Sequence, residues 1–145
     1  MKHLILAACA ALTLTGPALA QEDPDTLVTI LTAPEPQTQL MAMVLAMQAA
    51  QQGAAPHILL CGPAGDIALK DAPASATAPQ PPRDMSPKGL LGKIAEMPNA
   101  KVEVCAIYLP GKGLQADALM DGVTVAQPPA MAAAMIAPNA RIASY

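Results

Sequence analysis

Short apolar segments rich in β-branched residues alternate along this chain with segments that have helical spacing. The strand-like segments are residues 26–32, 57–61, 101–109, 123–126 and 141–145, and the helical ones are residues 37–52, 87–97, 115–121 and 129–137. Strict alternation of strands and helices is typical of parallel sheets covered by helices. We therefore expect an α/β fold, a small doubly wound parallel sheet of about five strands with helices on both faces.

Two of the expected helices each have one recognisable boundary signal, a stop signal in the first and a start signal in the second. Leu40 and Val44 lie four residues apart, as on one face of a helix, and Gly53 follows where that helix should end. Ser86 can cap a second helix, with Pro87 at its first position. These local signals support the helical half of the alternation.

The N-terminal segment has the pattern of a secretory signal. A positively charged start precedes an apolar run at residues 4–14, and an Ala-Leu-Ala cleavage site ends at Ala20. We expect residues 1–20 to be a signal peptide, residues 21–145 to form a single domain, and the protein to be periplasmic or secreted. A lipoprotein box ending at Cys9 is the alternative, although its apolar core would be short.

Charge and aromatic content exclude several classes of partner. The chain has 8 Lys and Arg against 11 Asp and Glu, and its aromatic residues are two tyrosines. A net negative charge argues against nucleic acid and anionic membranes, and bases would find few rings to stack on. No apolar stretch approaches membrane-spanning length. The Gly-containing turn at residues 62–65 is too loose for a phosphate loop, and we expect no cofactor.

Cys105 is the strongest candidate for a chemically reactive residue. It lies near the end of the third expected strand, and Gly111, Lys112 and Gly113 follow it. A turn at these glycines can present free amides, and amides together with a cation favour a thiolate over a thiol. The constellation suits sulfur transfer or thiol redox chemistry. A buried strand cysteine is the alternative interpretation.

The chain resembles the DsrE/DsrF-like family. The resemblance lies in residues 26–53, in residues 57–69, in Cys105 with the Lys-Gly-Leu of residues 112–114, and in residues 119–145. It implies a small doubly wound fold, often trimeric or hexameric, that holds sulfur as a persulfide on Cys105 during cytoplasmic sulfur relay. The export signal departs from that pattern and would put cytoplasmic partners out of reach.

Three other features could belong to the same site. Asp66 could line it or serve only in a turn, and Cys61, at the end of the second expected strand, is outside the family pattern. The proline-rich segment at residues 71–87 is expected to be an extended loop on the side of the sheet where ligand sites form. It is either a lid or a solvated insertion.

Cys61 and Cys105 raise the question of a disulfide. An even pair of cysteines in an oxidising compartment suggests one. In the common strand order 2-1-3-4-5, however, the first strand separates the second from the third, which places these cysteines about 9–10 Å apart. A disulfide needs Cα atoms about 4.4–6.8 Å apart. We therefore expect no bond between them, unless one cysteine lies in a loop.

Methionines and the single histidine of residues 21–145 are weaker candidates. Five methionines could bind copper in an exported protein, but their helical spacing fits core packing as well: Met41, Met43, Met47, Met131 and Met135. A zinc site of His57 with both cysteines lacks the usual ligand spacing, so we expect no metal.

Two hypotheses for function remain. One is a sulfur carrier or thiol-handling protein that acts through Cys105, with an unknown donor or acceptor protein as partner. The other is a non-catalytic binding or assembly module of the same fold. The family resemblance and an uncharged apolar helix at residues 129–137 predict a symmetric homo-oligomer in either case.

Overall fold

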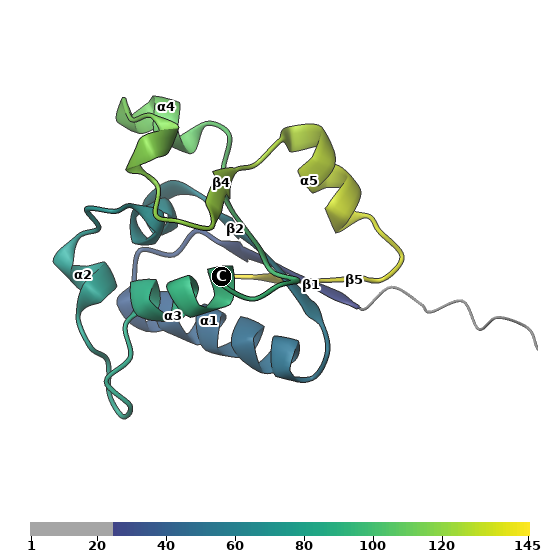
Figure 1. Ribbon diagram of the computed structural model, residues 1–145, viewed down its shortest axis with the longest axis horizontal. Helices are drawn as coiled ribbons and strands as arrows, with labels where there is room; N and C mark the ends of the chain where they lie inside the picture. The colour runs from purple at the N-terminus through teal and green to yellow at the C-terminus, as the bar shows by residue number, and fades with distance from the viewer. Residues whose placement is uncertain (1–24) are drawn as a thin grey trace, which may run out of the picture.

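A five-stranded parallel sheet forms the centre of the molecule in a computed structural model that describes residues 25–145. The predictions of signal cleavage and of lipidation lie outside the described residues. The strands are β1 (Thr26–Leu31), β2 (Ala55–Leu60), β3 (Lys101–Val104), β4 (Val123–Val125) and β5 (Ala140–Ser144). Helices flank the sheet on both sides, which confirms the predicted small α/β doubly wound fold (Figure 1).

The strand order is β4-β3-β2-β1-β5, so the expected order 2-1-3-4-5 is wrong. The first four strands succeed one another across the sheet in a single direction, and only β5 lies on the other side of β1. Right-handed crossovers that move in one direction place their helices on the same face, and a return crossover uses the opposite face. The practical result is that β2 and β3 are direct neighbours.

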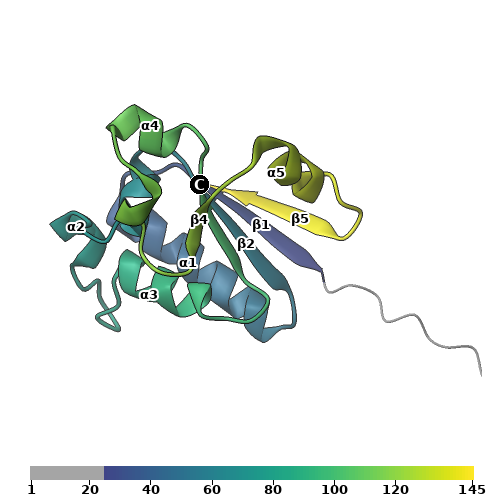
Figure 2. The same cartoon turned by 45° about the horizontal axis from the view of Figure 1, so that its top comes forward.

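Helices α1 (Pro36–Gln51) and α3 (Pro87–Ala95) cover one face of the sheet, and α5 (Pro128–Met135) lies over the other (Figure 2). The main core lies under α1 and α3, which pack against each other. Its fully buried side chains are aliphatic or Met and include Leu31, Met43, Ile58, Leu60, Leu91, Ile94 and Val104. This burial explains why β2 reads as a nearly continuous apolar run.

The third strand is shorter than residues 101–109. It ends at Val104, and the chain turns at once, because the Tyr108 N–H donates a 2.9 Å hydrogen bond to the Cys105 carbonyl. Helix α4 (Tyr108–Lys112) follows directly. Pro110 and Gly111 in this segment are poor strand residues, since one lacks an N–H and the other has no side chain to pack.

The segment at residues 71–87 is more ordered than the expected extended loop. It contains a short helix, α2 (Ala74–Thr77), and a bridge between Gln80 and Met85. The Ser86 hydroxyl accepts a 3.1 Å hydrogen bond from the Gly89 N–H, which confirms the predicted helix cap.

Two short 3₁₀ helices complete the described chain, η1 (Gly62–Ala68) after β2 and η2 (Ala116–Ala118) before β4. Both stand on the connections that follow the carboxyl ends of β2 and β3. Among residues 25–145, no helix is both long and apolar enough to cross a membrane.

Candidate functional site

Cys61 and Cys105 are joined by a disulfide, with their Cα atoms 5.1 Å apart. Each is the first residue after its strand, and each continues the ladder, since the N–H groups donate 2.9 Å bonds to the carbonyls of Leu31 and Leu60. The prediction that these cysteines do not pair is therefore wrong. It assumed that β1 lies between β2 and β3, whereas direct neighbours are only about 4.8 Å apart.

A polar cluster links the same two connections a few residues further on. The Asp66 carboxylate accepts a 2.6 Å hydrogen bond from the Tyr108 hydroxyl and forms a 2.8 Å ion pair with Lys112. Asp66 lies in η1 after β2, and its two partners lie in α4 after β3. Gly65 has no room for a side chain, because the Tyr108 ring packs where a Cβ atom would lie.

This cluster shifts the ionisation of two of its members. Burial disfavours the charged form of Asp66, but the hydrogen bonds from Lys112 and Tyr108 and the Lys112 charge outweigh burial, so the Asp66 pKa is lowered from its ordinary value. Burial first, and then the hydrogen bond to the Asp66 carboxylate and its charge, raise the Tyr108 pKa. At neutral pH the cluster therefore holds an ionised carboxylate and a protonated phenol.

The glycine amides are not free to face Cys105, contrary to the expectation from the sequence. The Gly111 N–H donates to the Ile107 carbonyl at 3.0 Å, and the Gly113 N–H donates to the Pro110 carbonyl at 3.1 Å. Gly113 does end α4 in the left-handed conformation, with φ of 67°. The glycines therefore shape the end of α4, while the Lys112 charge is paired with Asp66.

A small apolar cavity of about 260 Å³ opens beside Cys105, between the second face of the sheet and α5. Its walls are Leu59, Cys105, Ala106, Ala126, Pro128, Met131, Ala132 and Met135. Two of the methionines considered as copper ligands thus line this cavity. The sequence contained no signal for it, since it depends on α5 folding back over the ends of β2, β3 and β4.

A second polar pair lies within β2 and β3 themselves. His57 Nε2 and Glu103 Oε2 are 2.8 Å apart, and both side chains are buried. Lys101 Nζ lies 3.3 Å from the other carboxylate oxygen and is half exposed. His57 is thus paired with a carboxylate instead of the cysteines. Within residues 25–145, no group of three or more His, Cys, Asp or Glu is placed to bind a metal.

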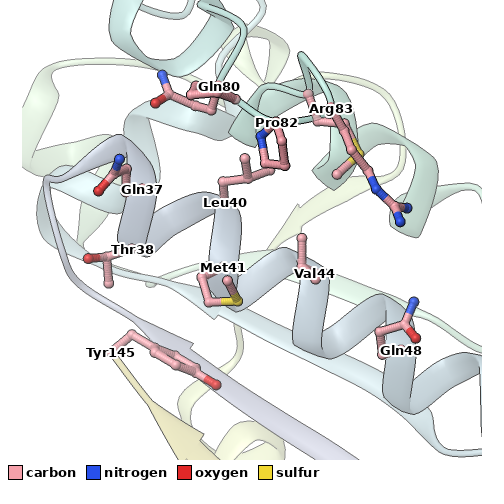
Figure 3. Close-up of a pocket in the computed structure, with 12 residues that line it drawn as sticks. Gln37, Thr38, Leu40, Met41, Val44, Gln48, Gln80, Pro82, Arg83 and Tyr145 are labelled. Atoms are coloured by element: carbon pink, nitrogen blue, oxygen red, sulfur yellow. The ribbon is translucent and has the colours of Figure 1, made fainter.

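A wide groove on the outer side of α1 contains neither cysteine. It measures about 710 Å³ and lies between α1, the loop around residues 80–85 and the C-terminal Tyr145 (Figure 3). Leu40, Met41 and Val44 form its apolar floor on α1, and the glutamines and Arg83 stand around its margin. Met41 therefore belongs to a groove surface away from the methionines of α5.

Comparison with known proteins adds information on the fold alone. No protein-family model and no curated protein matches the chain. The structure of a protein of unknown function, MTH1491 from Methanobacterium thermoautotrophicum, superposes with a TM-score of 0.58. That match has 13% sequence identity and covers 85% of this chain and all of the other. At this identity the similarity supports the α/β architecture and assigns no activity.

The residues singled out from the sequence divide into two groups in space. Cys61 pairs with Cys105, and Asp66 pairs with Lys112, while Gly111 and Gly113 shape the α4 turn that holds Lys112. Sequence reasoning missed Tyr108 and Glu103. Tyr108 was placed in the third strand, although it is one of only two aromatic residues in the chain. That scarcity was the one available signal for it.

Proposed function

We propose that this protein is an exported, DsrE-like thiol-handling protein in which Cys61 and Cys105 act as a dithiol–disulfide couple. The observation that supports the proposal is their disulfide at the carboxyl edge of neighbouring parallel strands. Ligand sites of parallel α/β sheets form at this edge. Both cysteines are only partly buried, so thiol reagents can reach them.

The couple can release sulfur that Cys105 has accepted. The Cys105 thiolate attacks the outer sulfur of a donor persulfide, the donor S–S bond breaks, and the donor leaves as a thiol. Cys61 then attacks the Cys105 sulfur. This step forms the disulfide and breaks the bond to the carried sulfur, which gains two electrons and leaves as hydrogen sulfide with two protons. A thiol reductant returns the disulfide to the dithiol.

Export fits the same chemistry. Disulfides persist in oxidising compartments and are rare in the cytosol, and the N-terminal segment has the pattern of a secretory signal. The periplasm is accordingly the compartment proposed for this protein. N-terminal sequencing of secreted material should begin at Gln21, whereas an intact Met1 or a lipid on Cys9 would contradict export by cleavage after Ala20.

The sulfur-handling proposal is tested with the reduced protein and an organic persulfide. We expect the wild-type protein to release hydrogen sulfide and to regain the Cys61–Cys105 disulfide. The Cys61→Ser variant should instead retain one extra sulfur atom on Cys105, visible by intact mass. Cys105→Ser is the matched control, because it keeps a single thiol at the other position. Equal loading of both variants would refute the assignment of Cys105.

A non-catalytic assembly module is the second candidate, and a specific observation favours it. The groups expected to activate a thiolate are engaged elsewhere, since Lys112 pairs with Asp66 and the amides of Gly111 and Gly113 bond within α4. In this alternative the disulfide is purely structural. Slow alkylation of the reduced protein at neutral pH, without sulfur loading, would favour it over the thiol-handling proposal.

A symmetric oligomer is proposed under both functions. Helix α5 has no charged residue, and most of its positions are exposed apart from the buried Met131. Ile136, just beyond α5, and Ile142 on the edge strand β5 are also exposed. Apolar surface of this kind is normally covered by a partner. Light scattering that gives a monomer at micromolar concentration would contradict this.

A further inference from the structure

Only apolar side chains and Cys105 line the cavity beside Cys105, among the residues that the structure describes. Leucine, alanine, proline and methionine side chains form its walls together with Cys105. Its volume of about 260 Å³ lies just below the ~300–1,000 Å³ of pockets that bind drug-sized molecules. A compound that fits here is therefore small and uncharged over most of its surface.

The cavity also distinguishes the two sulfurs of the disulfide. Cys105 is one of its lining residues, and Cys61 is not. A thiol held in the cavity is consequently next to the Cys105 sulfur. Exchange proceeds by attack of a thiolate on one sulfur while the other leaves. Approach through the cavity thus attaches the incoming group to Cys105 and releases Cys61.

A charged thiol would find no group of opposite charge in the cavity to replace the water that it loses. Lys112, the cation that the sequence assigned to this site, does not line the cavity and is paired with the Asp66 carboxylate at 2.8 Å. A carboxylate or ammonium group that entered the cavity would lose water without gaining a partner, which is unfavourable. Apolar substituents instead gain free energy by leaving water.

From these observations we infer that the natural exchange partner of the Cys61–Cys105 disulfide is a small, uncharged, apolar thiol. The inference rests on the proposed thiol-handling function and names its substrate class. With its R group in the cavity, a first thiol loses its proton to water at the partly exposed Cys105, and its sulfur attacks the Cys105 sulfur. This forms an R–S–S–Cys105 mixed disulfide and releases the Cys61 thiolate. A second RS⁻ attacks the R-bearing sulfur and releases Cys105 as thiolate. Two thiols are oxidised to RSSR, and the two cysteines gain their electrons and protons.

The test compares reduction rates of the oxidised protein by 1-propanethiol, 2-mercaptoethanol and 3-mercaptopropionate. Each rate is divided by the rate of the same thiol with bis(2-hydroxyethyl) disulfide, which removes differences in nucleophilicity. We expect 1-propanethiol to exceed 3-mercaptopropionate by about tenfold, because burial of its terminal methyl group contributes about fourfold and the carboxylate of the other thiol loses water on entering the cavity. Alkylation after partial reaction should place the mixed disulfide on Cys105 and the alkyl group on Cys61.

Two variants of α5 separate the cavity from general effects of charge. Ala132 lines the cavity and is exposed, so Ala132→Lys introduces a charge at its wall without disturbing the core. Ala133, its exposed neighbour, does not line the cavity, which makes Ala133→Lys the matched control. We expect Ala132→Lys to reduce the preference for 1-propanethiol to within about twofold, while Ala133→Lys retains it.

The possible outcomes distinguish failure of this inference from failure of the proposed thiol-handling function on which it rests. A disulfide that resists all three thiols in the folded protein would refute both. Exchange with no apolar preference, a mixed disulfide on Cys61, or identical behaviour of the two lysine variants would refute the inference alone. A cysteine peptide with apolar neighbours that reacts faster than 1-propanethiol would assign the cavity to a polypeptide and overturn the small-molecule assignment.

Discussion

Strands β2 and β3 are bridged by side chains in two regions that differ in burial and in chemistry. Within the strands, the His57–Glu103 pair is almost fully buried and lies in the hydrogen-bonded ladder. Just beyond the strands, the Cys61–Cys105 disulfide and the Asp66 cluster join the two connections at partly exposed positions.

The two regions differ in the interactions that remain when one side-chain bridge is removed. The inner region keeps its backbone ladder whatever happens to the His57 side chain. The outer region lacks a continuous ladder. The disulfide, the Asp66 cluster and an isolated bridge between Leu69 and Leu119 join its two connections. We therefore expect the outer region to open locally on reduction while the sheet stays folded, which is what a thiol-handling site requires.

Reduction of the disulfide should have the largest effect on stability. The bond joins cysteines 44 residues apart, and closing a loop of that size stabilises a protein by about 4 kcal/mol. The expected result is a loss of roughly that free energy of unfolding in urea, with the reduced protein still folded. The Cys61→Ser variant should show no further loss with reductant. A change below about 1 kcal/mol would mean that the outer region is held mainly by other contacts.

Substitution of His57 should have the next largest effect. The His57→Leu variant leaves the Glu103 carboxylate, 4% exposed, with only the half-exposed Lys101 as partner. The expected cost is about 3 kcal/mol, because a buried charge without its partner is strongly destabilising. Lys101→Leu is the matched control and should cost less than about 1 kcal/mol, since Lys101 is half exposed. Similar costs for both variants would contradict the distinction between the two regions.

Gly113→Val should damage the site more than the fold. Gly113 has φ of 67°, where a non-glycine residue costs about 1–2 kcal/mol. Strain at the end of α4 displaces Lys112 from Asp66 and alters the segment that follows Cys105, so we expect the rate of Cys105 alkylation in the reduced protein to change severalfold. Gly111→Val provides the comparison, because Gly111 has open space and no positive φ. Unchanged Cys105 reactivity in Gly113→Val would disprove this link.

Asp66→Asn should have the smallest effect and should be visible in the pH dependence of stability. The Asp66 pKa is lowered in the folded protein, so the carboxylate stabilises the fold above its ordinary pKa and this contribution is lost as pH falls through the folded pKa. At neutral pH the variant should lose about 1 kcal/mol, as expected for a partly exposed charged network.

Acid titration of unfolding provides the measurement for this prediction. Between pH 5 and lower values, the stability of the wild type should fall more steeply than that of Asp66→Asn. Tyr108→Phe is a useful control, because it removes one hydrogen bond and keeps the Lys112 ion pair. Parallel acid curves for the wild type and Asp66→Asn would show that the cluster adds nothing to stability.

Much of the candidate site could be named from the sequence, although not its arrangement. Cys61, Asp66, Cys105 and Lys112 were all candidates, and the α/β fold was expected. Their pairings were not, because they depend on β2 lying beside β3. Tyr108 was missed because a β-like run through Cys105 predicts a longer strand, whereas the chain turns into α4.

The sequence by itself determined the features that depend on a few neighbouring residues. These are the alternation of strands and helices, the cap at Ser86 and the left-handed position at Gly113. The tertiary structure decided which strands are neighbours, and with them the disulfide, the Asp66 cluster and the apolar cavity. The physical reason is range. Backbone propensities and caps act over about one turn of chain, whereas the pairing of cysteines 44 residues apart depends on the direction of crossovers and on how helices cover the two faces.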